Sequence, residues 1–457
     1  MAVASLPQTI DLSLDRLNRT IIRLALPSVA ESLLSTLIYF VDTIMLSWMN
    51  DPVALAAVGL SGTLMWAVEG LFQAVSISAS AMVARFWGEE NFERAREVAG
   101  QSLLLTMLVS LLLMALFIPA ARPFLVLMNA EAAVVEQGVA YMQIILIASP
   151  VSFLLTIANS IMRAAGDTQC PLYTSALMNG VKVLLAYPLI FGLGPIRGLG
   201  LTGAAISTSL SRALGGALAM VLLWVPRARI RLRWAHLKHW DWQTLRRIFR
   251  ISLPNIGETI ISRLGFMLFA RILSELGTVA IAAHQIALRV ESLAFMPGMG
   301  MSVAAAALVG QALGARKPHV AEQGISRTLL LTNIAMLGLG GCFVLGAPGI
   351  VRVFGIRNPE MVILAVQVVR ISALELFGLG TLMVLSGCLR GAGDTRTPMV
   401  VTLVGTLLFR VPITYLFALT LRGGLRGLWL GTAVDWSMRA LVMCAMYLRG
   451  QWKKVQI

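Results

Sequence analysis

The sequence predicts an all-α integral membrane protein, in which twelve transmembrane helices form two pseudo-symmetric six-helix lobes. The first observation is composition: 58% of the 457 residues are hydrophobic and 13% are charged, against about 25% charged residues in an average soluble domain. The mean hydropathy of +0.81 is that of a chain solvated mainly by lipid. The second is an internal duplication, and the third is the number of long apolar segments.

The duplication is clearest in one nine-residue motif. The segment RAAGDTQCP at residues 163–171 returns as RGAGDTRTP at residues 390–398, so that Asp167 and Asp394 are 227 residues apart (394 − 167). The same spacing relates Leu26-Pro27 to Leu253-Pro254 and Glu31 to Glu258. Two apolar halves of this kind predict a duplicated bundle, whose substrate sites lie between or within the halves near the bilayer midplane.

Twelve apolar segments are each long enough for the roughly 20 residues that a spanning helix needs. Their predicted spans are 21–47, 53–80, 98–121, 134–162, 171–195, 200–224, 250–275, 279–308, 324–350, 361–388, 398–420 and 427–448. The organisation that follows is an N-lobe over 1–225 with helices one to six, a linker over 226–249, and a C-lobe over 250–457 with helices seven to twelve.

The linker is basic and aromatic, as expected of a cytoplasmic segment lying on anionic headgroups. Its cations are Arg227, Arg229, Arg231, Arg233, Lys238, Arg246 and Arg247, and Trp234, Trp240 and Trp242 are interleaved with them. With the linker in the cytoplasm, the opposite loops hold only Arg122, Arg197, Arg352, Arg357, Arg422 and Arg426. This asymmetry predicts a multi-pass protein of a bacterial-type plasma (inner) membrane with both termini cytoplasmic. The net charge of +15 lies in loops between apolar segments, which disfavours nucleic acid as a partner.

The repeated Gly-Asp-Thr motifs predict tight cytoplasmic turns between helices four and five and between helices ten and eleven. Glycine ends a helix in the left-handed conformation, and aspartate caps the helix that follows. Proline is tolerated in the first turn of that helix. We expect a structural role for these turns.

Ionisable groups inside spanning helices are costly and are therefore candidates for function. Asp42 lies about 22 Å beyond Pro27, at ~1.5 Å per helical residue, deep within the first apolar segment. A carboxylate in such surroundings can load and release a proton near neutral pH. We therefore expect Asp42 to couple transport to a cation gradient.

The second half offers Glu258 in helix seven and Glu375 in helix ten, two acids that could bind H⁺, Na⁺ or an organic cation between them. Lys182 in helix five is expected to neutralise Asp42 or Glu69; a lysine that reaches to the membrane surface is the alternative. Further candidates for the cavity or for pairing are Glu69, Gln73, Asn179, His284 and Glu291. For His284 a satisfied core position is the other interpretation. Arg271–Glu275 and Asp435–Arg439 have the spacing of ion pairs along a helix.

Pro27 and Pro254 occupy matched positions early in helices one and seven. A proline inside a helix removes one backbone hydrogen bond and permits a bend. Both prolines are candidate positions at which a helix bends as the transporter changes between two packing arrangements. The PGMG segment at 297–300 is likewise expected to interrupt helix eight.

The chain resembles the multidrug and toxic compound extrusion (MATE) family over nearly its whole length. The resemblance rests on VDTIM at 41–45, the repeated turn motifs, AAHQI at 282–286 and VGQALGA at 309–315. It implies a V-shaped bundle of two lobes, alternating access, and export of organic cations against inward H⁺ or Na⁺. It also matches Asp42 to the first-helix aspartate of the family's N-lobe cation site, and Pro27 to the proline at which that helix bends.

Two departures from the family pattern affect the C-lobe. Ser262 and Leu379 stand where the best-known bacterial branch carries a glutamate and an aspartate, while Glu258 and Glu375 each lie one turn earlier. Either the two acids have moved together or the C-lobe cation site is absent. In helix five, the ammonium of Lys182 would repel sodium, which favours proton coupling.

The leading hypothesis is thus a secondary antiporter for lipophilic, mostly cationic compounds, with H⁺ or Na⁺ as coupling ion, no cofactor, and a monomeric state in the bilayer. The alternative is a flippase for a lipid-linked sugar, whose cavity should be lined by Arg and Lys. An enzyme is disfavoured, because the sequence has no paired-histidine metal motif, no clustered aspartates for a metal-bound phosphate and no Ser/His/Asp arrangement. The sequence leaves the identity of any bound metal open.

Overall fold

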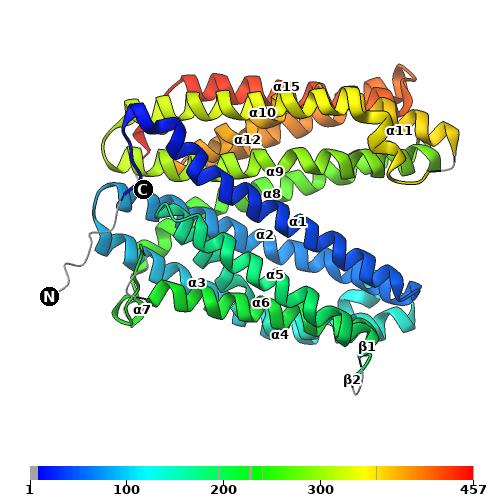
Figure 1. Ribbon diagram of the computed structural model, residues 1–457, viewed down its shortest axis with the longest axis horizontal. Helices are drawn as coiled ribbons and strands as arrows, with labels where there is room; N and C mark the ends of the chain where they lie inside the picture. Colours follow the sequence, from blue (N-terminus) through cyan, green and yellow to red (C-terminus); the bar gives the residue numbers. More distant parts are fainter. Residues whose placement is uncertain (1–8, 194–195, 226–228, 239, 357, 456–457) are drawn as a thin grey trace. The chain divides into compact units, whose positions relative to one another are not determined.

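The computed structural model describes residues 9–193, 196–225, 229–238, 240–356 and 358–455, and the chain is almost entirely helical (Figure 1). Arg227 and Arg357 of the predicted loops lie outside the described residues. The first half contains η1 (Leu14–Arg16), α1 (Leu17–Trp48), α2 (Pro52–Gly88), α3 (Phe92–Leu127), α4 (Ala132–Ala164), α5 (Gln169–Phe191), a hairpin of β1 (Gly192–Leu193) and β2 (Ile196–Arg197), α6 (Gly200–Trp224) and α7 (Ala235–Lys238). The second half contains α8 (Trp242–Ser274), α9 (Thr278–Gly314), α10 (Pro318–Arg352), α11 (Pro359–Ser372), α12 (Leu376–Gly391), α13 (Arg396–Val404), η2 (Gly405–Arg410), α14 (Val411–Tyr415), η3 (Leu416–Thr420), α15 (Gly424–Leu448) and η4 (Gln451–Lys454).

These elements give twelve membrane passes, because α11 and α12 form one bent pass and α13 to η3 form another. Within the described ranges, nine helices are long and apolar enough to cross a membrane, and the bent pair makes ten. α8 and α15 complete the twelve; charged side chains such as Glu258 in α8 and Asp435 in α15 interrupt their apolar stretches.

The chain folds into two compact units. The first holds Ala30–Phe249, and the second holds Ile10–Val29 together with Arg250–Ile457. The N-terminal part of α1 thus packs with the second half of the sequence, contrary to the expectation that residues 1–225 form one lobe. Both α1 and α8 run from one unit into the other, and each carries a proline close to the crossing, Pro27 in α1 and Pro254 in α8.

Both Gly-Asp-Thr turns form as predicted. Gly166 and Gly393 have positive φ values of 86° and 87°, which a glycine adopts at no steric cost. Asp167 Oδ1 accepts a hydrogen bond from the Cys170 N–H at 3.1 Å. In the second copy, Asp394 Oδ1 accepts one from the Thr397 N–H at 3.0 Å. The aspartates therefore satisfy free N–H groups at the starts of α5 and α13.

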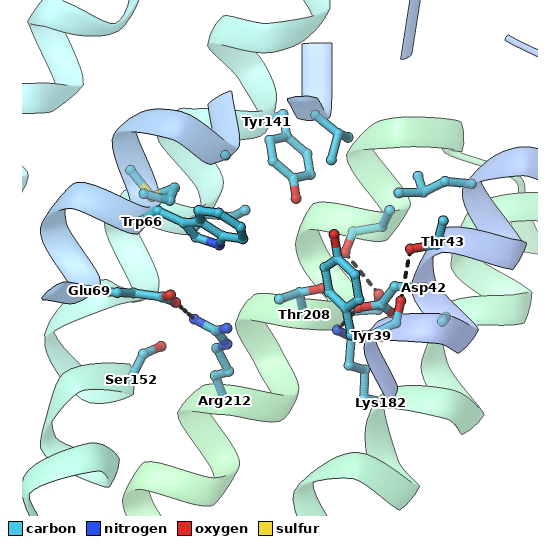
Figure 2. A pocket seen from close by; sticks show the side chains of 18 of the residues that line it. Tyr39, Asp42, Thr43, Trp66, Glu69, Tyr141, Ser152, Lys182, Thr208 and Arg212 are labelled. Atoms are coloured by element: carbon cyan, nitrogen blue, oxygen red, sulfur yellow. Dashed lines mark hydrogen bonds and ion pairs between the residues drawn. The ribbon is translucent and has the colours of Figure 1, made fainter. Parts of the chain in front are cut away.

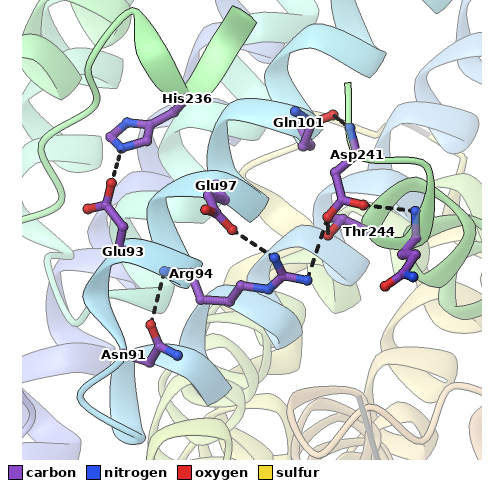
Figure 3. Close-up of polar contacts among 9 residues, drawn as sticks. Asn91, Glu93, Arg94, Glu97, Gln101, His236, Asp241 and Thr244 are labelled. Atoms are coloured by element: carbon purple, nitrogen blue, oxygen red, sulfur yellow. Dashed lines mark hydrogen bonds and ion pairs between the residues drawn. The ribbon is translucent and has the colours of Figure 1, made fainter. Parts of the chain in front are cut away.

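The linker packs onto the start of α3 (Figure 3). His236 Nδ1 accepts the Arg233 N–H, so its Nε2–H donates to Glu93 at 2.8 Å. Asp241 precedes α8, and its carboxylate lies 3.5 Å from the Arg94 guanidinium and accepts the Thr244 hydroxyl at 2.6 Å. The hydrogen bond from Thr244 holds the pKa of the Asp241 carboxyl below its usual value.

One local prediction about helix continuity is wrong, and two of the predicted spans contain an internal irregularity. α9 continues through Pro297 and residues 298–300, and the glycines there serve close packing: a Cβ on Gly300 would lie 2.7 Å from the Val29 nitrogen. The predicted span 361–388 is broken instead, with α11 and α12 at 49° to each other. The span 398–420 contains two π-helical stretches, η2 and η3. π-Helical turns often occur at functional sites, and sequence patterns do not reveal them.

Candidate functional site

A cavity of about 410 Å³ lies inside the first unit, a volume suited to a small organic ligand. Helices α1, α2, α4, α5 and α6 line it. Its polar side chains come from Tyr39, Asp42, Thr43, Thr63, Trp66, Glu69, Tyr141, Ser149, Ser152, Lys182, Ser207, Thr208 and Arg212. We call it the first-unit cavity.

The predicted coupling residue Asp42 lies in this cavity, and its partner is Lys182. The Lys182 ammonium donates to the Asp42 carboxylate from α5 to α1. The Lys182 side chain is 10% exposed and that of Asp42 is 30% exposed, so the carboxylate is the more open of the two. Lys182 neutralises Asp42, which was one of the two partners expected for it, and it does not extend to the membrane surface.

A second ion pair lies in the same cavity. Arg212 Nη1 on α6 donates to Glu69 Oε1 on α2 at 3.0 Å, and both side chains are 42% exposed. Figure 2 shows this pair apart from the group formed by Asp42, Lys182 and Tyr39. Sequence reasoning did not single out Arg212, although a lone cation inside an apolar segment is itself a signal that a carboxylate lies nearby. With two acids and two bases, the charges of the cavity balance.

Aromatic faces complete the lining. Tyr39 and Trp66 are 62% and 59% exposed although both lie in the middle of helices, and Tyr141 also borders the cavity (Figure 2). Aromatic faces attract organic cations through their electron-rich rings. The cavity thus combines carboxylates with surfaces that suit a lipophilic cation.

Two other first-half candidates lie outside the lining. Asn179 is buried one turn before Lys182, and neither its amide oxygen nor its amide nitrogen has a hydrogen-bond partner within the described segments. Gln73 is exposed on α2.

Glu31 and Glu258 form the same structure in the two halves. Arg163 Nη1 donates to both Glu31 oxygens at 3.0 and 2.9 Å, and Ser175 donates to one of them. Arg390 Nη2 donates to both Glu258 oxygens at 2.7 and 2.8 Å, and Thr402 donates at 3.2 Å. The partners are 132 and 144 residues away in both cases, so these two Glu–Arg pairs are duplicated with the chain. Glu258 is therefore tied to the arginine of the Gly-Asp-Thr turn.

A charge cluster is buried in the second unit. It consists of Glu291, Glu375, Arg410, Asp435 and Arg439, which we call the second-unit charge cluster. Asp435 accepts hydrogen bonds from Arg410 Nε at 3.0 Å and from Arg439 Nε at 2.6 Å, and all three side chains are nearly inaccessible. The Asp435–Arg439 pair was predicted from spacing, as was the exposed Arg271–Glu275 pair at 3.6 Å.

Glu375 lies in the break between α11 and α12 and is completely buried. Its carboxyl lies against that of Glu291 on α9, and neither of its oxygens accepts a hydrogen bond from the described parts of the chain. Two buried carboxylates in contact cannot both stay ionised without a cation between them. The cluster contains three carboxyl groups and two guanidinium groups, so one additional positive charge would make it neutral.

His284 is a core residue of the second unit. Its Nδ1 accepts the Trp429 indole N–H at 3.1 Å, and its ring packs against those of Phe269 and Trp429. The interpretation of His284 as a satisfied core histidine is confirmed. Across the described residues, no group of three or more His, Cys, Asp or Glu side chains could hold a metal ion.

Comparisons with known proteins agree with the duplication. The MatE family model matches twice, at residues 27–188 and 254–416. The probable multidrug resistance protein NorM of Thermotoga maritima is 30% identical over 442 residues, which cover 96% of this chain and 94% of that protein. The uncharacterized transporter YisQ of Bacillus subtilis is 23% identical and covers 90% of each chain.

Solved structures show the same fold. The crystal structure of a MATE protein in a straight conformation matches 98% of this chain and all of its own, with a TM-score of 0.90 at 24% identity. A Pyrococcus furiosus transporter of the MOP superfamily, described as having a binding pocket of reversed polarity, covers 98% of this chain and all of its own, with a TM-score of 0.89 at 23% identity. The two-lobe, twelve-helix fold class is confirmed.

Proposed function

The chain belongs to the MatE family of multidrug transporters, and we propose that it is a secondary antiporter that exports lipophilic, mostly cationic compounds in exchange for inward protons. The observation that carries the proposal is the first-unit cavity, which sets the carboxylates of Asp42 and Glu69 beside the exposed rings of Tyr39 and Trp66. Carboxylates attract positively charged ligands, and aromatic faces bind organic cations.

The coupling cation has two candidate positions in this proposal. One is the Asp42 site of the first-unit cavity. The other is Glu375 with Glu291, where the second-unit charge cluster has one carboxylate in excess. Glu258 takes a structural role, because Arg390 and Thr402 already satisfy it.

Protons fit these positions better than sodium. At Asp42 the fixed ammonium of Lys182 repels a metal cation. At Glu375, the guanidinium of Arg410 lies within electrostatic reach of the pair of carboxyls. A proton needs no shell of oxygen ligands and can be shared by two carboxyls.

Alternating access then needs two elements that bend, and α1 and α8 provide them. Each helix belongs to both units, and Pro27 and Pro254 lack the backbone N–H that would brace the helix. Bending at these positions would let the units change their arrangement while the packing inside each unit is kept. In this proposal the protein is a monomer of the bacterial inner membrane, with both termini in the cytoplasm.

A flippase for a lipid-linked sugar is less well supported. A pyrophosphate headgroup calls for an excess of Arg and Lys, whereas both cations of the first-unit cavity are paired with acids. A cavity without net positive charge gives an anionic headgroup little to bind.

The test is uptake of ethidium into inverted membrane vesicles, driven separately by a proton gradient and by a sodium gradient. We expect accumulation with the proton gradient alone, loss of that accumulation in Asp42→Asn, and normal accumulation in Asp15→Asn, a matched change at an exposed aspartate. Uptake driven by sodium alone would contradict proton coupling. Failure under both gradients, with protein present in the membrane, would contradict the antiporter and favour the flippase.

A further inference from the structure

We propose that the exchanged proton is carried by Lys182: a cationic cargo takes the place of the Lys182 ammonium against Asp42, and the displaced amine releases its proton. This inference rests on the proposed exchange of organic cations for protons. It moves the exchangeable proton from the carboxylate of the site to the lysine that faces it.

The geometry of the ion pair permits this replacement. Lys182 and Asp42 both line the first-unit cavity, and the carboxylate is the more exposed partner, so an entering cation meets Asp42 first. The exposed ring of Tyr39 lies one turn before Asp42 on the same face of α1. A lipophilic cation can therefore approach the carboxylate while its apolar body contacts an aromatic face.

The charges of the reaction balance. Before exchange, the carboxylate of Asp42 is neutralised by the ammonium of Lys182; afterwards it is neutralised by the cargo. One N–H bond of Lys182 breaks, its electron pair stays on the nitrogen, and the proton leaves to water. The net charge of the cavity is unchanged, because one positive charge enters as one departs. An ammonium left without a partner in a desolvated site would be costly, which drives the loss of the proton.

The second ion pair of the cavity cannot do the same. If a cation displaced Arg212 from Glu69, the guanidinium would keep its charge, because arginine is not deprotonated in proteins. Of the two cations that line this cavity, Lys182 is the one able to exchange its charge for that of a ligand.

The surroundings of Lys182 come from four helices. The other ionisable groups that line the cavity are Tyr39 and Asp42 on α1, Glu69 on α2, Tyr141 on α4 and Arg212 on α6; Asp42 and Arg212 act electrostatically on Lys182. Asn179, one turn away on α5, has an amide group without a partner within the described segments. That amide is placed on the same face as Lys182 and offers the neutral amine a hydrogen-bond partner once Asp42 is occupied.

Lys182→Arg is the decisive variant, because it keeps the ion pair and cannot release a proton. Purified protein is titrated with ethidium in buffers of different ionisation enthalpy, which gives the number of protons released for each ligand bound. The wild type is expected to release one proton for each ethidium. Lys182→Arg is expected to release none and to lose proton-driven accumulation, whereas Lys454→Met, at an exposed lysine, behaves like the wild type.

Lys182→Met supplies a second, independent readout. Without the lysine, the carboxyl of Asp42 is the group of this ion pair that can exchange a proton for the cation, and carboxyl groups titrate at much lower pH than amines. The pH midpoint of ethidium affinity should therefore fall in Lys182→Met, and affinity should become weak and independent of pH in Asp42→Asn/Lys182→Met. This readout decides the question if Lys182→Arg does not fold, as judged by thermal unfolding.

The outcomes separate the two proposals. A wild type without proton-driven accumulation contradicts the proposed function. A wild type that exchanges normally, with Lys182→Arg still releasing one proton per ethidium or with an unchanged pH midpoint in Lys182→Met, overturns the role of Lys182 and leaves the antiporter standing.

Discussion

The structure indicates that the Glu258–Arg390 ion pair stabilises the second half of the chain and takes no part in proton coupling. We predict that Glu258→Gln lowers the free energy of unfolding and leaves the coupling of transport to protons intact. The reason is that Arg390 donates to both carboxyl oxygens at 2.7 and 2.8 Å, and Thr402 adds a third hydrogen bond at 3.2 Å. The carboxylate therefore braces the turn between α12 and α13.

The size of the effect follows from charge and burial. A hydrogen bond to a charged group contributes about 1.5–3 kcal/mol, and breaking a fully buried ion pair costs about 3–5 kcal/mol. The side chains of Glu258 and Arg390 are 14% and 26% exposed, so water partly compensates the broken pair. We therefore expect a coupling energy between Glu258→Gln and Arg390→Met in the lower of these two ranges, about 1.5–3 kcal/mol, which is that of a hydrogen bond to a charged group.

The assay is a double-mutant cycle on unfolding free energies in detergent micelles, with ethidium transport measured on the same variants. The matched control is the cycle of Glu31→Gln with Arg163→Met, because that pair has the same geometry in the first half. The two coupling energies should agree within about 0.5 kcal/mol, the usual limit of such cycles. A coupling energy near zero, together with loss of proton-driven transport in a stable Glu258→Gln, would contradict the structural role of Glu258 and restore it as a coupling acid.

Three further predictions address other parts of the structure. Gly405→Ala should lower the unfolding temperature, because its Cβ would overlap the buried Arg439 side chain. Gly405→Ser should lower it further, and an unchanged melting curve would contradict this packing. The pKa of Asp241 is lowered in the folded protein, so its capping contribution to stability, about 1 kcal/mol, is present above the unfolded pKa and is lost as the pH falls through the lower, folded pKa. The rate of amide hydrogen exchange at the start of α8 should therefore rise below about pH 4. Asp241→Asn should remove this pH dependence of the exchange rate. Glu375→Gln should lower proton-driven ethidium accumulation while equilibrium binding of ethidium stays measurable. Accumulation by Glu375→Gln at the level of the wild type would exclude Glu375 as a coupling residue.

Much of this architecture could be predicted because it depends on local rules. The turns at Gly166 and Gly393 follow from glycine's left-handed conformation and from aspartate capping, both of which act within four residues. The partnership of Lys182 with Asp42 was foreseeable for a different reason: a lone cation and a lone anion in neighbouring apolar segments each need the other.

The partners of Glu258 and Glu69 could not be predicted in this way, because they depend on which helices become neighbours. Glu258 finds Arg390 at a separation of 132 residues, and Glu69 finds Arg212 at 143. The signal available for Glu258 was the duplication itself, since its counterpart Glu31 and the turn arginine both recur at the same spacing. The break beside Glu375 has no sequence signature of its own, because its residues, 373–375, include neither glycine nor proline.

The duplication also separates scaffold from chemistry. Positions that hold the fold recur 227 residues later with the same residue: Pro27 as Pro254, Glu31 as Glu258, and Arg163 as Arg390. Their pairwise contacts recur as well, with equal separations in both halves. These residues therefore serve what the two halves have in common, which is the packing of a six-helix bundle.

The charged residues assigned to proton exchange, Asp42, Lys182 and Glu375, do not recur, although Arg212 of the first-unit cavity does, as Arg439. At the positions 227 residues beyond Asp42 and Lys182 stand Phe269 and Phe409, and the first-half counterpart of Glu375 is an alanine. A role in the bundle alone would apply to both halves equally, so a charge present in one half and replaced by an apolar side chain in the other needs a different explanation. Burying a charged side chain destabilises the bundle, and here the charge is buried in one half only. This is expected if the first unit binds the cargo by ion exchange and the second unit holds a proton on its excess carboxylate. By this criterion Glu258 belongs with the scaffold residues, because its counterpart Glu31 makes the same contacts in the first half.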